Sequence, residues 1–60
     1  MTLDNALKLV RSGGCVTDER GKVELSERRG VLFLTIKNQD TITSEEIVRA
    51  LYWREIWVAK

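Results

Sequence analysis

The stretch Tyr52-Trp53-Arg54-Glu55-Ile56-Trp57-Val58 contains three of the four aromatic residues of the chain. Aromatic side chains contribute the largest buried area per residue, so this stretch should decide how a chain of 60 residues holds together. An aromatic ring left exposed in the same stretch would offer a flat apolar surface to a partner. The segment therefore bears on both the core and the binding surface of the protein.

A helix is predicted immediately before the aromatic stretch. Thr43-Ser44-Glu45-Glu46 fits a capping box, with Thr43 as the N-cap and Glu46 at the third helical position. Ile42 and Ile47 are spaced as a hydrophobic staple across this helix start.

The periodicity of this helix gives it an apolar and a polar side. Ile47 and Leu51, with Val48 as a further candidate, are expected to face the core, and Arg49 is expected to face solvent. The helix should end near Tyr52.

A final strand is expected from Glu55 to Ala59. Alternation along a strand places Ile56 and Val58 on one face and Trp57 on the other. This separation favours Trp57 as a subunit-interface residue. Trp53, at the junction of helix and strand, is favoured as a ligand contact.

The opposite end of the chain predicts another helix, from Leu3 to about Arg11. Thr2 is placed to cap it, and Gly13 and Gly14 are placed to end it, with one of them in the left-handed conformation. The residues that recur at helical spacing on its apolar side are Leu3, Ala6, Leu7 and Val10.

Short β-prone segments fill the middle of the chain. The expected strands are Cys15–Thr17, Lys22–Arg28 and Val31–Ile36, separated by turns at Asp18–Gly21 and Arg29–Gly30 and followed by a turn at Asn38–Asp40. The apolar run Val31–Ile36 predicts a strand covered on both faces, one by helices and the other by a second subunit. The order predicts a small single α+β domain over residues 1–60: helix, two or three antiparallel strands, helix, strand.

Size predicts self-association. A chain of this length buries only about 60% of its unfolded surface and usually needs a disulfide, a metal or a partner subunit. Cys15 is the only cysteine and there is no histidine, so an internal disulfide is excluded and the commonest metal ligand is absent. We therefore expect a homo-oligomer without cofactors or metals.

Composition also bears on partners and location. Ten Lys and Arg against nine Asp and Glu give a net charge of +1, which makes nucleic acid an unlikely partner, because nucleic-acid-binding domains usually carry a basic excess. The first residues, Met1–Asn5, lack the pattern of a signal peptide, and no apolar run reaches the roughly 18 residues of a membrane span. A cytoplasmic location is expected.

An enzyme is not expected. Without histidine, and with no Gly-rich phosphate loop, only carboxylates, lysines and one thiol remain as acid–base groups. Glu45 and Glu46 are adjacent, so on a helix they point about 100° apart and do not converge. Cys15 is expected to be a packed core thiol.

Two basic turns are candidates for anion binding. Arg28-Arg29 could bind phosphate through guanidinium groups, or could be a solvated hairpin turn. Arg20 and Lys22 flank Gly21, where a glycine turn could bring backbone donors close to an anion, or could be an ordinary turn.

The aromatic stretch is the third candidate. Trp53 and Tyr52 could stack on a nucleobase while Arg54 contacts a phosphate. Alternatively, Tyr52, Trp53 and Trp57 fill the core or a subunit interface.

Two segments of the sequence carry a family resemblance. The opening Asn5–Thr17, an amphipathic helix leading into a strand, and the closing segments Thr43–Val48 and Glu55–Val58 resemble the short phage Thoeris anti-defence proteins of the second type. Leu32–Leu34 resembles the central apolar strand of that family. The family usually has Gly-Trp after the first strand, whereas here Lys22 follows Gly21.

The resemblance implies a phage-encoded oligomer, in the host cytoplasm, that sequesters a cyclic nucleotide-type immune signal such as a cyclic ADP-ribose isomer. It extends residue by residue only to Gly21 and to the turn around Arg20 and Lys22. The leading hypothesis is thus a non-enzymatic oligomer that holds the nucleotide in a pocket between subunits. Arg20 and Lys22, or Arg28 and Arg54, would neutralise phosphates there, and Trp53 or Tyr52 would stack on the base. The alternatives are a small inhibitor that docks on a host protein through a strand edge or the aromatic surface, and, more weakly, a DNA-binding regulator.

Overall fold

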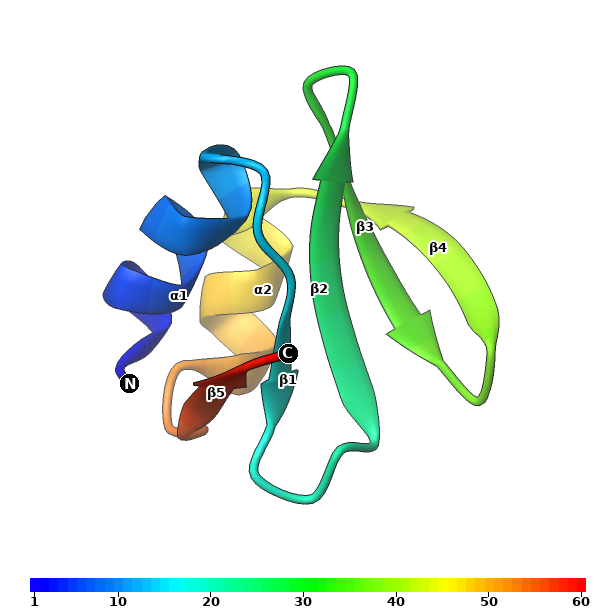
Figure 1. Cartoon of the computed structure of the whole chain (residues 1–60). Helices are drawn as coiled ribbons and strands as arrows, with labels where there is room; N and C mark the ends of the chain where they lie inside the picture. The colour runs from blue at the N-terminus through cyan, green and yellow to red at the C-terminus, as the bar shows by residue number, and fades with distance from the viewer.

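A computed structural model describes all 60 residues and shows two helices beside one five-stranded antiparallel sheet (Figure 1), which confirms the expected α+β class. The elements follow in the order α1 (Leu3–Arg11), β1 (Val16–Asp18), β2 (Val23–Arg28), β3 (Val31–Ile36), β4 (Gln39–Thr43), α2 (Glu45–Tyr52) and β5 (Trp57–Ala59). No helix is long and apolar enough to cross a membrane.

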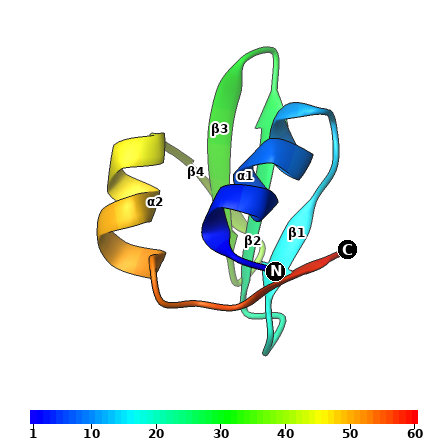
Figure 2. The same cartoon turned by 90° about the vertical axis from the view of Figure 1, so that its left-hand side faces the viewer.

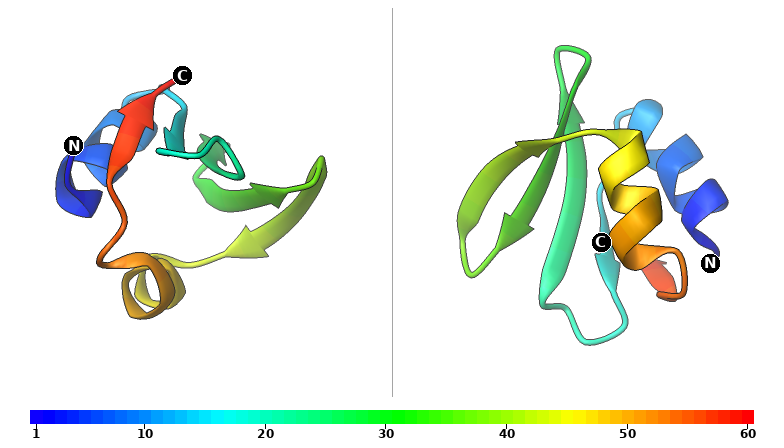
Figure 3. Two further views of the ribbon diagram at one scale, coloured as in Figure 1. Left: turned by 90° about the horizontal axis from the view of Figure 1, so that it is seen from below. Right: turned by 180° about the vertical axis from the view of Figure 1, so that it is seen from behind.

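The strands lie side by side in the order β4-β3-β2-β1-β5, and every neighbouring pair is antiparallel. Seen from below, they follow a curved path, with α1 near the β5 end and α2 across the open side of the curve (Figure 3). The β1–β2 and β3–β4 turns lie at one end of the sheet, and the β2–β3 turn lies at the other (Figure 1).

Strand β4 was not expected, and the predicted turn at Asn38–Asp40 is wrong by one residue. The turn is formed by Lys37 and Asn38, both in the left-handed region with φ of 53° and 65°. Two successive left-handed residues make a tight hairpin. Gln39 therefore returns directly opposite Ile36, and four strands rather than two or three lie between the helices.

Helix α1 has the predicted bounds and the predicted caps. The Thr2 side chain accepts a hydrogen bond from the Asn5 backbone N–H at 3.3 Å, and a left-handed Gly13 follows the helix. Its four expected apolar residues are all buried and face the sheet.

The core is small and centres on Trp57, which is fully buried. Its eight members are Leu3, Ala6, Leu7, Val10, Val16, Leu25, Val48 and Trp57. Tyr52 packs edge-on against Trp57, with ring centroids 6.2 Å apart and planes at 75°. Trp57 is thus a core residue of one chain, and the expectation that it lies at a subunit interface is wrong; the predicted opposition of Trp57 to exposed Ile56 and Val58 is confirmed.

Helix α2 is rotated relative to the prediction. Ser44, not Thr43, is the N-cap, and its side chain accepts from the Ile47 backbone N–H at 3.3 Å. Val48 is the buried residue, whereas Ile47 and Leu51 are 51% and 66% exposed. The expected staple is also absent, because Ile42 lies on β4 and is 70% exposed.

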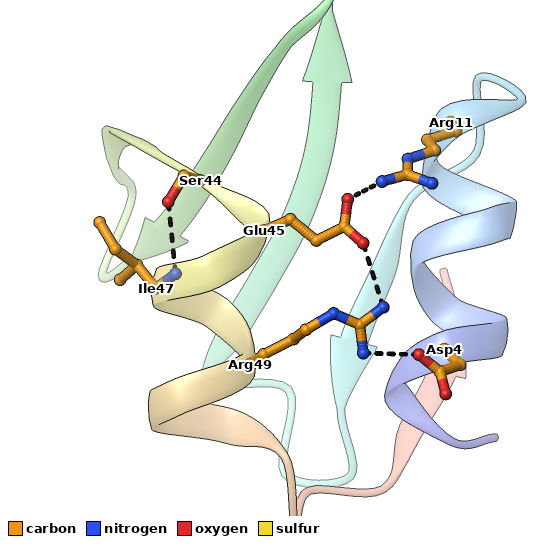
Figure 4. Close-up of polar contacts among 6 residues, drawn as sticks. All are labelled: Asp4, Arg11, Ser44, Glu45, Ile47 and Arg49. Atoms are coloured by element: carbon orange, nitrogen blue, oxygen red, sulfur yellow. Dashed lines mark hydrogen bonds and ion pairs between the residues drawn. The ribbon is translucent and has the colours of Figure 1, made fainter.

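Ion pairs accompany this orientation of α2. Arg49 and Glu45 turn toward α1, where Arg49 donates to Asp4 and Glu45 pairs with Arg11 (Figure 4). Arg49 is therefore exposed to solvent, as predicted, but its guanidinium is paired with Asp4 and Glu45.

The two faces of the sheet differ in their cover. On the inner face of β3, Leu32 and Leu34 pack against the core, while Phe33 and Thr35 alternate to the outer face. Both helices lie on the same side of the sheet (Figure 2), so the outer face carries no other element of this chain. The predicted cover of both faces of β3 is therefore not provided within one chain.

Candidate functional site

A polar hollow with a volume of about 620 Å³ lies at the end of the sheet where the β1–β2 and β3–β4 turns meet. Only one of its nine lining residues, Ile36, is hydrophobic. The others are Thr17, Gly21, Lys22, Glu24, Thr35, Lys37, Asn38 and Lys60.

The register of three strands builds the floor of the hollow. Thr17 of β1 lies opposite Glu24 of β2, and Glu24 lies opposite Thr35 of β3. Residues that pair across neighbouring strands share a face of the sheet. Two hydroxyls and a carboxylate therefore form a continuous polar row on the outer face.

Three lysines and a single carboxylate give the hollow its charge. Lys60 forms an ion pair with Glu24, which lowers the pKa of Glu24 and raises the pKa of Lys60 through the bond between them. Lys22 and Lys37 have no ion-pair partner in the chain. Two ammonium groups are thus free to meet a negatively charged ligand.

The β1–β2 turn is held by Asp18, which is buried at the end of β1. Its carboxylate Oδ1 accepts from the backbone N–H groups of Lys22 at 2.7 Å and Val23 at 3.2 Å, and its carbonyl accepts from Gly21 at 3.0 Å. The expectation that backbone donors at Gly21 reach an anion is therefore wrong, because Asp18 already occupies them. Gly21 is needed for its left-handed φ of 71°.

Lys22, which the sequence proposed as part of an anion-binding turn around Gly21, does line the hollow. Arg20 belongs to the same exposed turn but does not line the hollow. Of the predicted site residues, Gly21 and Lys22 are brought together here with lysines that the sequence did not single out.

Arg28 lies elsewhere, at the opposite end of β2 from Lys22. Its guanidinium donates to Asp40 at 2.6 Å and stacks over the Phe33 ring at 4.2 Å from the centroid. The pKa of Asp40 is lowered most by the hydrogen bond that its carboxylate accepts from Thr35, and next by the one that it accepts from Arg28. Arg28 is thus occupied by a carboxylate of its own chain.

The aromatic candidates lie at the end of α2. Trp53 is 62% exposed, and the Arg54 guanidinium covers its ring at 4.6 Å from the centroid. Tyr52 is half-buried against Trp57, so only one of its sides faces outward. Trp53 and Arg54 form a separate surface that does not line the polar hollow.

A second cavity, of about 460 Å³, lies between α1, the β2–β3 turn and the start of α2. Leu7, Val10, Val31 and Leu32 form its apolar lining. The Arg11–Glu45 ion pair lies among its lining residues. The charged residues that line this cavity, Arg11, Glu27 and Glu45, sum to −1, whereas those that line the polar hollow sum to +2. None of the predicted ligand-binding residues lines this second cavity.

Cys15 precedes β1 and is half-buried, not fully packed as expected. Burial, together with a hydrogen bond to Glu24, raises the pKa of its thiol. No group of three His, Cys, Asp or Glu side chains is placed to hold a metal ion.

Sequence reasoning missed Lys37, Asn38 and Lys60, together with the polar row beneath them. Asn38 tolerates the left-handed conformation and was already assigned to a turn, so a two-residue hairpin at this position was the available signal. The row Thr17, Glu24 and Thr35 needs the register of two hairpins, which the sequence alone does not fix.

Comparisons with models of known protein families, with curated protein sequences and with solved structures found no match. Function is therefore inferred from the geometry of this chain.

Proposed function

We propose that the protein binds a small anionic ligand of the nucleotide type and holds it, without turnover, in the polar hollow. The observation that carries this proposal is the convergence of Lys22, Lys37 and Lys60 on one hollow with a single carboxylate, Glu24. A volume of about 620 Å³ is in the range of small-molecule sites.

The lining suits a phosphorylated ligand. Lys22 and Lys37 would contact phosphate oxygens as point charges. The Thr17 hydroxyl can donate and accept, whereas the Thr35 hydroxyl donates to Asp40 and can only accept from a ligand. Both groups suit ribose or base edges. Ile36 is the one hydrophobic side chain of the lining, and the methyl groups of the threonines and the methylene chains of the lysines add apolar contact for a base or ribose ring.

Sequestration, not catalysis, fits the groups present. The sequence has no histidine, and the one thiol lies outside the lining and has its pKa raised by burial. A binding protein needs no proton transfer. The resemblance to phage anti-defence proteins suggests the same role: removal of a cyclic nucleotide-type immune signal, such as a cyclic ADP-ribose isomer, in the host cytoplasm by an oligomer of this chain.

Thermal-shift and calorimetric titration with cyclic nucleotides, cyclic dinucleotides and cyclic ADP-ribose isomers test the proposal. We expect one of them to stabilise the fold, by about 2.7 kcal/mol at 100 times its dissociation constant. Lys22→Ala combined with Lys37→Ala should weaken binding at least tenfold, and chromatography should recover the ligand unchanged.

Arg20→Ala is the matched control, because Arg20 lies in the same turn outside the lining. The proposal fails if none of these ligands binds. It also fails if the double lysine variant binds as well as the Arg20 variant.

A second candidate function is inhibition of a host protein through the free edge of the sheet. The backbone of β4 has a neighbour on one side only, and Ile42 on this edge is 70% exposed. At the other edge, Met1 and Trp57 exchange two backbone hydrogen bonds, of 2.5 and 2.9 Å. An extended peptide could therefore add to β4. Recovery of one stoichiometric host protein, lost with Ile42→Pro, which removes an N–H that points away from β3, would favour this function.

A further inference from the structure

Apolar side chains form a row on α2 that the rest of the chain leaves largely uncovered. Ile47 and Leu51 are 51% and 66% exposed, and Ala50 beside them is also exposed. Trp53, two positions beyond Leu51 and covered by the Arg54 guanidinium, does not belong to this row. Residues three and four apart on a helix lie side by side on one surface. Figure 4 shows Ile47 projecting from the side of α2 that faces away from α1.

We infer that a second copy of this chain covers this row, through an antiparallel pairing of the two α2 helices about a two-fold axis. The row is self-complementary. Ala50 lies at its middle, where a small side chain lets two helix backbones approach closely, while Ile47 and Leu51 flank it. Antiparallel packing would place each Leu51 near Ile47 of the partner subunit.

Charge at the two ends of the row favours the antiparallel direction. Glu46 lies at the start of α2, and Arg54 lies just beyond its end. Neither has an ion-pair partner within the chain. In an antiparallel pair each Glu46 lies near Arg54 of the partner subunit, so two complementary contacts form. A parallel pair would instead bring like charges and like helix ends together.

This interface is separate from the proposed ligand site. The hollow lies among the turns at one end of the sheet, whereas the row lies on α2, beside the inner face. None of its residues lines the hollow. Loss of the dimer and loss of ligand binding can therefore be measured independently.

The mass of the protein in solution tests the inference. We expect light scattering at about 100 µM to give at least twice the chain mass, and Leu51→Lys to reduce it to that of one chain. Ile42→Lys is the matched control, since Ile42 is 70% exposed on β4, away from α2. Circular dichroism should show that both variants remain folded, because neither side chain is buried.

Two further variants test the antiparallel geometry. Glu46→Arg and Arg54→Glu should each weaken the dimer at least tenfold, and the double variant should restore it. Ala50→Cys should cross-link two chains under mild oxidation, because the row places Ala50 near the axis. A monomeric wild-type protein would overturn the inference, as would a dimer that survives Leu51→Lys. Failure of both the charge reversal and the cross-link would overturn the antiparallel arrangement.

Discussion

The guanidinium of Arg49 on α2 donates to the carboxylate of Asp4 on α1 at 2.6 Å, joining residues 45 positions apart. Its second nitrogen donates to Glu45 at 3.0 Å, and the other oxygen of Glu45 pairs with Arg11 (Figure 4). These four side chains form one continuous network between the helices. The network holds α2 with Val48 toward the core.

The network predicts a salt-dependent contribution to stability. We expect Glu45→Gln to lower the free energy of unfolding by about 0.5–1 kcal/mol at low salt, because Glu45 joins two arginines and surface pairs contribute amounts of this size. Screening should reduce the loss in 1 M NaCl. Urea denaturation at both salt concentrations measures it. Glu55→Gln, which removes an exposed charge without an ion pair, should change little; equal losses in the two variants would contradict the network.

The two tryptophans should differ sharply in their effect on folding. Trp57 is fully buried, so Trp57→Ala should cost about 3–5 kcal/mol. A domain of this size has roughly 3–9 kcal/mol in all, so this variant should be largely unfolded by circular dichroism. Trp53→Ala should lie within about 0.5 kcal/mol of the wild type, because Trp53 is 62% exposed. Similar losses for both would show that the core is not centred on Trp57.

The parts of the fold that the sequence predicts correctly are those with local signals. Helix α1 carries a cap at Thr2, a regular apolar stripe and a glycine after its end. The Arg29-Gly30 turn likewise separates two segments with strong β propensity. Each of these signals acts within a few residues, so no tertiary information is needed.

The parts that failed depend on a shift of a single residue. Thr43 and Ser44 are both good N-caps, and the helix begins one residue later than predicted. Ile47 and Leu51 were expected to face the core, but the buried residue is Val48, about 100° around the helix from Ile47. At the β3–β4 turn, left-handed Lys37 is not a residue type that marks a hairpin, so β4 was not recognised.

Only those residues of the candidate site that are neighbours in the sequence were predicted. Gly21 and Lys22 belong to one turn and could be identified together. Lys37 and Lys60 join them only through the sheet register, which places residues from three strands and two turns around one hollow. No local pattern contains that information.

Asp40 provides a test of the outer face by pH. A hydrogen bond from Thr35 at 2.6 Å, and then one from Arg28, lower the pKa of this carboxyl. A folded-state pKa below the unfolded value means that these contacts stabilise the fold at neutral pH. Their contribution is lost as the pH falls through the folded-state pKa, below the ordinary carboxyl range. We expect Thr35→Val to raise the pKa in a carbon-13 titration and Thr35→Ser to preserve it. A low pKa that persists in Thr35→Val would contradict the assigned cause.

Cys15 should react slowly with alkylating reagents. Burial raises the pKa of its thiol, and the hydrogen bond and charge of Glu24 raise it further, so little thiolate is present near neutral pH. We expect iodoacetamide at pH 7.5 to modify the folded protein several-fold more slowly than the urea-unfolded chain. Glu24→Gln should increase the rate in the folded state. An unchanged rate in that variant would show that burial alone controls the thiol.

The β2–β3 hairpin contains a position that a different residue would suit better. Arg29 and Gly30 have φ of 53° and 78°, so both central residues are left-handed. This conformation costs a side chain such as arginine roughly 1 kcal/mol, whereas Asn-Gly is a favoured pair for such a turn. We therefore expect Arg29→Asn to raise the free energy of unfolding by about 0.5–1 kcal/mol. Arg20→Asn is the control, because Arg20 lies in an exposed turn without a positive φ. Equal changes in the two variants in urea denaturation would mean that loss of positive charge, not relief of backbone strain, produces the effect.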